Sequence, residues 1–419
     1  MKKNVLRIAG VVAMTALFVG CSNEAEDSTI NGSELILENN GVEVMNEDVG
    51  KGQPIPGQYI VVYNTDFARS MNAQESTQAV LNLTQEILGV TNKTAADLNI
   101  KNIYSRSING VTMALTNEQV NAIRNDNRIK YIEQDQIVQF APPCGTPNGG
   151  PCDGGGGGGG GDTSQETPWG ITRVNGGVTY TGNNVAWILD SGIDLDHEDL
   201  NVNASLGFNA FTSGKDGQSL DDGNGHGTHV AGTIAAVDNS TGVIGVAAGA
   251  TVVPVKVLGS RGSGSYSGVI AGVDHVAANG SSGDVANMSL GGPISVALED
   301  AIAAAAQNGI RFMLAAGNES QDANNVSPAR VNGNNIYTIS SMSQGDNWSS
   351  FSNYGNPPVD YCAPGSAIKS TWKNGGYNTI SGTSMATPHA AGVLLLGNAS
   401  TSGTVNGDPD GNPDAIITH

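Results

Sequence analysis

Four residues between positions 190 and 384 have the chemical types that peptide hydrolysis by a hydroxyl nucleophile requires. This reaction needs a nucleophile, a base that takes its proton, a carboxylate that holds the base in one tautomer, and amide donors that stabilise an oxyanion. In chain order, the candidates are Asp190 as the orienting acid, His226 as the general base, Asn318 as an oxyanion donor and Ser384 as the nucleophile. Each residue alone also fits a structural role, such as a turn or a helix cap, so the interpretation depends on the combination.

The residues around each candidate predict whether it lies at the end of a strand or at the start of a helix. Asp190 ends the apolar run VAWILD, which predicts a carboxylate at the carboxyl end of a strand, where open α/β sheets gather their sites. His226 lies in NGHGTHVAGT and is expected to open a buried helix, and Asn318 closes the run RFMLAAGN. Ser384 lies in SGTSMATPHAAG at an expected strand-to-helix turn, where unpaired amides and the helix dipole favour negative charge.

The elements that must position these residues follow a regular pattern. From Pro168 onward, apolar strand-like runs alternate with helical stretches, which predicts an α/β fold with a doubly wound, mostly parallel sheet covered by helices on both faces. From Gln58 to Phe140 the expected order is β-α-β-β-α-β, with helices over residues 70–90 and 116–127, a small α+β ferredoxin-like domain. Thr116 and Gln119 form a capping-box pattern at the start of the second helix.

The first 21 residues have the features of an export signal. Lys2, Lys3 and Arg7 precede an apolar stretch, and small residues precede Cys21. The end FVGC resembles a bacterial lipobox, in which the cysteine thiol takes a diacylglycerol; an ordinary signal peptide is the alternative. The chain of 419 residues is too long for one ordinary domain. We divide it into a signal at 1–21, an acidic tether at 22–55, the small domain at 56–140, a Gly/Pro-rich linker with eight consecutive glycines at 141–164, and the α/β domain at 165–419.

The amino-acid composition argues against some binding partners and some classes of protein. Asp and Glu total 39 against 19 for Lys and Arg, so nucleic acid is a poor candidate partner. Only 14% of residues are charged and 58 are Gly, a composition seen in extracellular enzymes with many turns, and the long apolar runs exclude a disordered acidic protein. Cys144 and Cys152 enclose a Gly/Pro-rich loop that could close as a disulfide, which would leave Cys362 unpaired.

The stretches around the four candidate residues resemble those of a known family, both in their amino-acid sequences and in their order along the chain. The chain resembles the subtilisin and proteinase K family from about Pro168 to Gly397, through the stretches WILDSGIDLDHEDL, NGHGTHVAGTIAA, VVPVKVLG, NMSLGGP, AAGNES, YCAPG and SGTSMATPHAAG. The resemblance implies a secreted serine endopeptidase with a triad of Asp190, His226 and Ser384 and with Asn318 as the oxyanion donor. This agrees with the roles inferred from the residue chemistry, and the chain order excludes the chymotrypsin arrangement.

The resemblance also implies a substrate cleft. In the family, an extended substrate pairs with enzyme backbone and adds a strand, and small residues wall a pocket that takes an aromatic or long aliphatic side chain. The substrate-binding residues implied are Gly262, Ser263, Gly264, Ser289, Leu290, Gly291, Ala315, Ala316 and Gly317.

The resemblance to this family also implies a structural calcium site. Its ligands would be the side chains of Gln165, Asp199 and Asn239 and the backbone carbonyls of Val237, Thr241 and Val243. An all-oxygen shell suits calcium, whereas a solvated polar loop is the alternative, and zinc at His226 and His229 is disfavoured. The later stretch DPDGNPD, with Asp408, Asp410, Asn412 and Asp414, is either a short calcium loop or a simple turn.

Residues 56–140 resemble the propeptide of the same family. Such a segment assists folding, places its C-terminal tail in the active site as a product-like inhibitor, and is then cleaved. The expected partners are therefore protein and peptide substrates and the chain's own propeptide, and the expected protein is an exported monomer. Two other classes stay open: a silent peptide-binding surface protein, and a calcium-dependent adhesive lipoprotein that leaves peptides uncut.

Overall fold

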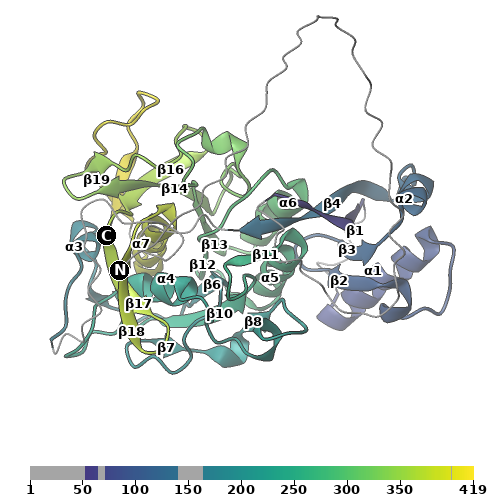
Figure 1. The fold of residues 1–419 in the computed structure, drawn as a ribbon, viewed down its shortest axis with the longest axis horizontal. Helices are drawn as coiled ribbons and strands as arrows, with labels where there is room; N and C mark the ends of the chain where they lie inside the picture. Colours follow the sequence, from purple (N-terminus) through teal and green to yellow (C-terminus); the bar gives the residue numbers. More distant parts are fainter. Residues whose placement is uncertain (1–51, 65–70, 140–163, 398) are drawn as a thin grey trace, which may run out of the picture. The chain divides into compact units, whose positions relative to one another are not determined.

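The computed structural model describes residues 52–64, 71–139, 164–397 and 399–419. These residues build an N-terminal α+β domain and a larger α/β domain (Figure 1). The expected export signal, nearly all of the tether and the linker, and Cys21, Cys144 and Cys152 lie outside the described residues. Cys362 is a buried free cysteine, and burial raises the pKa of its thiol.

The N-terminal domain has the expected β-α-β-β-α-β order. Its elements are β1 (Pro54–Tyr63), α1 (Ala73–Ile87), the 3-10 turn η2 (Ala96–Leu98), β2 (Ile100–Tyr104), β3 (Gly110–Ala114), α2 (Asn117–Ile123) and β4 (Ile129–Gln139). The strands form an antiparallel sheet in the order β4-β1-β3-β2. The capping box of Thr116 and Gln119 is present, but α2 ends at Ile123, earlier than expected. Strand β1 begins at Pro54, two residues before the expected start of the domain.

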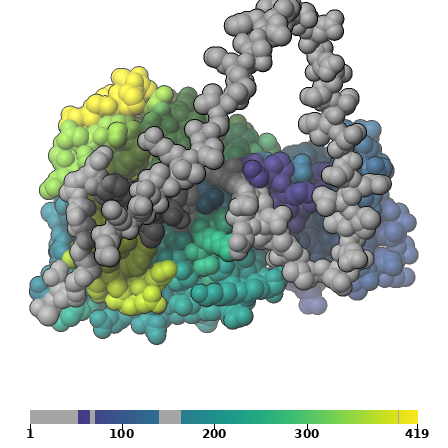
Figure 2. All heavy atoms as spheres, in the orientation of Figure 1, coloured from purple at the N-terminus to yellow at the C-terminus, as the bar shows by residue number. Residues whose placement is uncertain are grey.

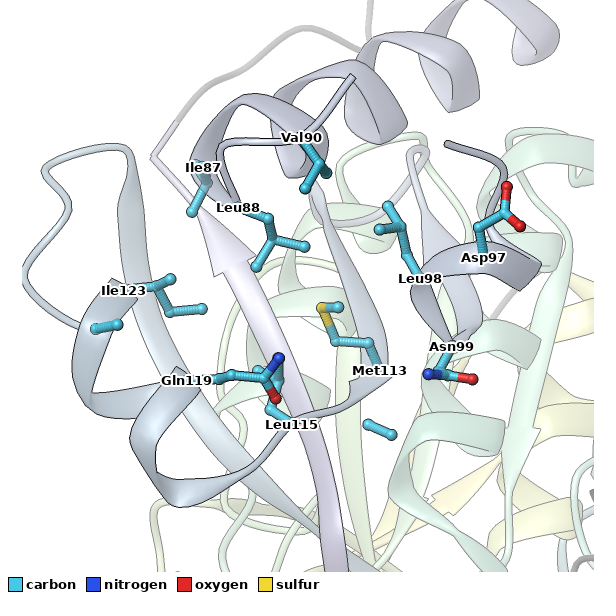
Figure 3. Close-up of a pocket in the computed structure, with 12 residues that line it drawn as sticks. Ile87, Leu88, Val90, Asp97, Leu98, Asn99, Met113, Leu115, Gln119 and Ile123 are labelled. Carbon is cyan, nitrogen blue, oxygen red and sulfur yellow. The ribbon is translucent and has the colours of Figure 1, made fainter. Parts of the chain in front are cut away.

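The two helices of this domain leave a pocket of about 410 Å³ on their side of the sheet. Figure 3 shows Leu88 at the end of α1, Leu98 in η2, Met113 on β3 and Ile123 in α2 around it. None of the candidate catalytic residues lines this pocket.

The larger domain alternates strands and helices along most of its length. Its elements are α3 (Trp169–Arg173), β5 (Val178–Thr179), β6 (Ala186–Asp190), β7 (Asn201–Val202), η3 (Ala204–Leu206), β8 (Phe208–Asn209), η4 (Asp216–Gln218), α4 (His226–Ala235), β9 (Ala247–Ala248), β10 (Thr251–Lys256), β11 (Ser263–Ser265), α5 (Tyr266–Asn279), β12 (Val285–Met288), α6 (Val296–Ala306), β13 (Arg311–Ala315), η5 (Ala323–Asn325), β14 (Ile336–Ser343), β15 (Asn347–Trp348), β16 (Val359–Pro364), β17 (Ile368–Trp372), β18 (Gly376–Ile380), α7 (Thr383–Leu396), β19 (Ser400–Thr404) and β20 (Ala415–Thr418).

The central strands of this domain are parallel, in the order β16-β14-β13-β12-β6-β10. Strand β6 pairs with β10 on one side and with β12 on the other, so the chain reverses its direction of winding at β6. Ligands of open α/β sheets bind at the carboxyl ends of the strands beside such a switch point. This topology places the end of β6, where Asp190 lies, at the expected position for a site.

Helices cover both faces of this sheet, as the apolar strand runs require. Along β6, Trp187 and Leu189 join the core under α5 and α6, whereas Ala186 and Ile188 join the core under α4 and α7. Figure 1 shows the two helix pairs on opposite sides of β6, β12 and β13. Burying one large aliphatic side chain contributes roughly 1.5–3 kcal/mol, so the two cores together hold the strand ends in place. The expected doubly wound α/β fold is confirmed.

The last described segment adds a strand pair to the sheet. Strand β20 pairs with β16 and with β19, and every residue of β19 is exposed (Figure 2, yellow). In the DPDGNPD stretch between them, the Asp414 carboxylate accepts hydrogen bonds from Ser340 and Asn356. The described residues contain no gathering of three or more His, Cys, Asp or Glu side chains suited to a metal ion. Within the same residues, no helix is both long and apolar enough for a membrane span.

Candidate active site

Asp190 and His226 form a buried acid–imidazole pair at the carboxyl end of β6. The His226 Nδ1 atom lies 2.8 and 2.9 Å from the two carboxylate oxygens of Asp190, and both side chains are fully buried. The Ser191 amide donates to the same carboxylate at 2.7 Å. A carboxylate on Nδ1 keeps the proton on that nitrogen, which leaves Nε2 as the basic atom of a neutral imidazole.

Glycines on both sides of His226 allow α4 to begin against the end of β6. Gly225 has a φ of 114°, and a Cβ there would lie 2.3 Å from the Trp372 ring. A Cβ at position 227 would lie 2.1 Å from the Gly192 carbonyl oxygen. A side chain at position 225 would collide with the Trp372 ring, and one at position 227 would push α4 away from the turn that follows β6. The two glycines therefore permit the short distance between His226 and Asp190.

Ser384 is the second residue of α7, so its amide lies in the unpaired first turn of that helix. Helices α4 and α7 pack against each other. Pro388 has no amide hydrogen to donate to the Ser384 carbonyl four residues earlier. The Ser289 hydroxyl supplies the missing donor at 2.8 Å, and the Ser384 hydroxyl donates to the Ser289 carbonyl at 3.2 Å. Ser384 is therefore held through both its backbone and its side chain.

Asn318 lies beside the Ser384 amide with its carboxamide held in one orientation. Its Oδ1 accepts from the Thr383 amide at 2.8 Å and from the Thr383 hydroxyl at 2.9 Å, and a backbone amide can only donate, so the oxygen must face Thr383. A Cβ built on Gly382 would lie 3.5 Å from the Asn318 Nδ2 atom and 3.7 Å from the Ser384 amide nitrogen. Both nitrogen atoms thus lie around one point, at which Gly382 has no side chain.

Sequence reasoning missed three residues that support this space. Thr383 orients Asn318, and Asn353 accepts from the Glu319 amide at 3.0 Å while donating to the Ala316 carbonyl at 2.9 Å. The Glu319 carboxylate accepts from the Asn318 amide at 2.9 Å. Thr383 could have been found from its position next to Ser384, but Asn353 is remote in sequence and carries no such signal.

We expect Asn318→Ala to lower kcat by roughly 10²–10³-fold with little change in KM, because the oxyanion forms only after attack. The loss matches the effect of removing this kind of donor in a subtilisin. Steady-state hydrolysis of a chromogenic peptide measures it. Asn201→Ala is a suitable control because that amide bonds to Gly249 and Thr251, away from Ser384. A loss of the same size in both variants would contradict the assignment.

The expected substrate-binding residues lie on three segments, residues 262–264, 289–291 and 315–317. Strand β11 pairs antiparallel with the end of β4, with Gly264 opposite Val138 and Ser263 opposite Gln139, so an extended segment already lies along it. The side chains of Leu290 and Ala316 are buried in core clusters, so only their backbone is available to a substrate. The Ala316 carbonyl is bonded to Asn353.

The expected calcium ligands also lie together. The Gln165 Nε2 atom is 2.7 Å from the Val237 carbonyl oxygen and 3.4 Å from that of Val243. The Asn239 side-chain amide donates to the Asp199 carboxylate at 2.6 Å and accepts from the Thr241 amide at 2.7 Å. Burial raises the pKa of Asp199.

The second histidine of the NGHGTH stretch does not join the first in a metal site. His229 Nε2 lies 2.9 Å from the Ile368 carbonyl oxygen, and the ring is fully buried. Burial lowers the pKa of His229 to about 3, so the imidazole is neutral at neutral pH. With His226 bonded to Asp190, the geometry gives zinc no support.

Comparisons with known proteins agree with this geometry. A model of the subtilase family matches residues 183–402, and a model of the peptidase inhibitor I9 family matches residues 58–141. The chain is 40% identical over 353 residues to alkaline serine exoprotease A of Vibrio alginolyticus, covering 82% of this chain and 60% of that protein. It is 37% identical over 365 residues to an extracellular serine proteinase of a Thermus species, covering 82% and 80%.

A solved structure is similar as well. The crystal structure of a cold-adapted subtilisin-like serine proteinase is 41% identical in sequence, with a TM-score of 0.50. The match covers 59% of this chain and 96% of that one.

Proposed function

Because the chain belongs to the subtilase family, we propose that it is an exported serine endopeptidase, made as a precursor that its own N-terminal domain inhibits. The observation that carries this proposal is that the Asn318 Nδ2 atom and the Ser384 amide nitrogen lie around one point beside Gly382, next to Ser384. A peptide-binding protein without turnover has no use for two donors aimed at an oxyanion.

In the proposed reaction, the Ser384 hydroxyl attacks the scissile carbonyl carbon while His226 Nε2 takes its proton. Asp190 holds the resulting imidazolium through Nδ1, and Asn318 and the Ser384 amide hold the oxyanion. The C–N bond then breaks as the imidazolium returns its proton to the leaving amine. Water, deprotonated by the same imidazole, adds to the acyl-enzyme, and cleavage of the ester bond regenerates the Ser384 hydroxyl.

The first experiment is hydrolysis of casein by the processed protein before and after treatment with a sulfonyl fluoride, which modifies an activated serine. We expect activity to disappear as one sulfonyl group is added, and peptide mapping to place it on Ser384. Turnover that survives complete labelling, or an unlabelled protein without turnover, would overturn the proposal.

Contacts between the two domains support the inhibitory role. The end of β4 continues the sheet through β11, in the position that an extended substrate would take. On the N-terminal domain, Glu133 accepts from the Ala297 amide at 3.1 Å and Asp135 accepts from the Ser267 amide at 3.1 Å, so each carboxylate caps a helix of the larger domain. Asp274 of the larger domain accepts in return from the amides of residues 105–107, at 3.2, 2.8 and 2.6 Å.

We expect Asp274→Asn to speed dissociation of the cleaved N-terminal domain by roughly tenfold or more, because an amide nitrogen would face buried N–H donors. The lag before a diluted, freshly processed sample begins to hydrolyse a peptide measures this rate. Lys130→Ala is the control: it breaks the half-exposed ion pair with Asp300, whose contribution is at most about 1 kcal/mol. Equal lags in Asp274→Asn and the unchanged protein would contradict the prediction.

A structural calcium ion is part of the proposal, and the residues present fit it. Gln165 and Asn239 now direct their amide nitrogens at the Val237 carbonyl and the Asp199 carboxylate. Turning the Gln165 amide over would present its oxygen, and the Asn239 oxygen, which accepts from the Thr241 amide, keeps a second lone pair for the ion. With the Asp199 carboxylate and the backbone carbonyls, these oxygens would form an all-oxygen set, which suits calcium. The ion would stabilise the fold by linking the start of the larger domain to the loop after α4.

We expect a chelator to lower the thermal midpoint of an inactive Ser384→Ala sample, and Asp199→Asn to abolish that dependence. With free calcium a hundredfold above its Kd, the ion contributes about 2.7 kcal/mol to the free energy of unfolding. Scanning calorimetry with and without calcium measures the shift. If Asp199→Asn still responded to calcium while Asp408→Asn did not, the ion would belong to the DPDGNPD stretch.

The remaining parts of the proposal rest on the sequence and the relatives. Export follows the basic and apolar start of the chain and the extracellular relative from Thermus. A lipid on the Cys21 thiol, a monomeric protein, and a preference for large apolar side chains complete the proposed description.

A further inference from the structure

A buried carboxylate outside the four candidate residues is bonded to both sides of the general base. Asp222 is 4% exposed. Its Oδ1 accepts from the Asn224 amide at 2.9 Å and from the Gly225 amide at 2.8 Å, just before His226. Its Oδ2 accepts from the amide and the hydroxyl of Thr228, at 2.9 and 2.7 Å, just after His226.

Asp222 supplies the cap that α4 lacks at its own first position. The residue at the N-cap is Gly225, which has no side chain to accept from the unpaired first-turn amides. The Thr228 amide is one of these, and Asp222 satisfies it from four residues before the base. The negative charge also lies at the favourable end of the helix dipole.

The same carboxylate ties this helix to the strand that carries the triad acid. Ser191, which directly follows Asp190, donates its hydroxyl to Asp222 Oδ1 at 2.9 Å and accepts from the Gly227 amide at 3.0 Å. One hydrogen-bonded network around His226 thus includes Asp190, Ser191, Asp222 and the first turn of α4. Lys256 and Lys373 hold the neighbouring turn by donating, each at 2.8 Å, to the carbonyls of residues 221 and 223.

We propose that Asp222 is a positioning residue for the general base, which sets the place and angle of His226 against Asp190. The inference rests on the proposed function, because it concerns the same reaction. All five atoms bonded to Asp222 donate, so an ionised carboxylate is the only side chain of this shape that satisfies them. An asparagine would direct an NH₂ group at one set of donors and loosen the turn that carries His226.

The test is Asp222→Asn beside a matched control, Asp284→Asn. Asp284 is also buried, and it accepts from the Asn184 side chain and from Val185, Trp187 and Ser281 at 2.9–3.1 Å. It serves the amino end of β6, away from the triad. We expect Asp222→Asn to lower kcat by roughly 10–100-fold with KM within about twofold, because a displacement of the base near 1 Å costs rate on this scale. We expect Asp284→Asn to keep the kcat of the unchanged protein. It should lower the thermal midpoint of unfolding by about as much as Asp222→Asn does.

Equal kcat values in the two variants, or a change in KM alone, would assign Asp222 a structural role and overturn the proposal. If the Asp222→Asn precursor does not fold, Ser191→Ala removes one link of the same network and decides: a fall in kcat at constant KM supports the proposal, and an unchanged kcat overturns it. Absence of turnover in the unchanged, processed protein is a different result, because it would reject the proposed function itself.

Discussion

Ser384→Ala is expected to lower kcat by roughly 10⁶-fold, the scale on which removal of the nucleophile acts in a subtilisin. The nearby Ser289 hydroxyl is not available to replace it, since it is already bonded to the Ser384 carbonyl. The residual rate would come from the oxyanion donors and substrate binding alone. The same variant should remain an uncleaved precursor, because processing uses the same serine.

Ser381→Ala is the matched control for that experiment. Its hydroxyl accepts from the Ala367 amide at 2.7 Å, three residues before Ser384, so the variant loses this hydrogen bond but none of the four candidate catalytic residues. Activity should stay within severalfold, and processing should be complete. Loss of turnover in both variants, with both folded by circular dichroism, would show that this turn matters only for structure.

Asp190→Asn is expected to lower kcat by roughly 10⁴-fold at neutral pH, as the equivalent change does in a serine protease of another fold. Both oxygens of Asp190 lie within 2.9 Å of His226 Nδ1, so one of them would be replaced by a donor NH₂ group. An amide that donates to Nδ1 places the proton on Nε2, and that tautomer cannot accept the proton of Ser384. Kinetics of a small peptide substrate measure the loss, which should fall on kcat more than on KM.

Asp194→Asn tests whether the effect is specific. This carboxylate lies on the loop that follows β6, is buried, and accepts from the Gly375 amide at 2.8 Å. It should cost stability but keep the rate within about tenfold, since it does not touch His226. A comparable fall in kcat for both aspartates would mean that the loop, rather than the Asp190 charge, controls the base.

The fold and the positions of Asp190, His226 and Ser384 on their elements could be predicted from the sequence because local patterns determine them. Alternation of apolar runs gave the sheet with helices on both faces, and Asp190 and Ser384 lie at a strand end and a helix start as their flanking residues predict. Gly227 also indicates a close approach of two backbone segments, since a Cβ there would lie 2.1 Å from the Gly192 carbonyl oxygen. These are properties of neighbouring residues, which a single sequence contains.

The supporting residues could not be predicted, because their partners are distant in sequence. Asp222 reads as an ordinary loop aspartate until the fold brings Ser191 to it. Asn353 reaches the Ala316 carbonyl across 37 residues, and Ser289 reaches the Ser384 carbonyl across 95. Pro388 carried a usable signal, since a proline four residues after Ser384 removes a helical donor and implies a replacement from elsewhere. Its identity still required the structure.

The pairing of β11 with the end of β4 has a consequence for which proteins this enzyme could cut. A cleft that binds its substrate as an added strand needs a segment whose own backbone groups are not already paired. Folded proteins offer such segments only when they open locally, so cleavage would follow the population of opened states rather than surface sequence. The enzyme would then discriminate among proteins by their local stability, removing damaged or loosely folded chains and sparing compact ones.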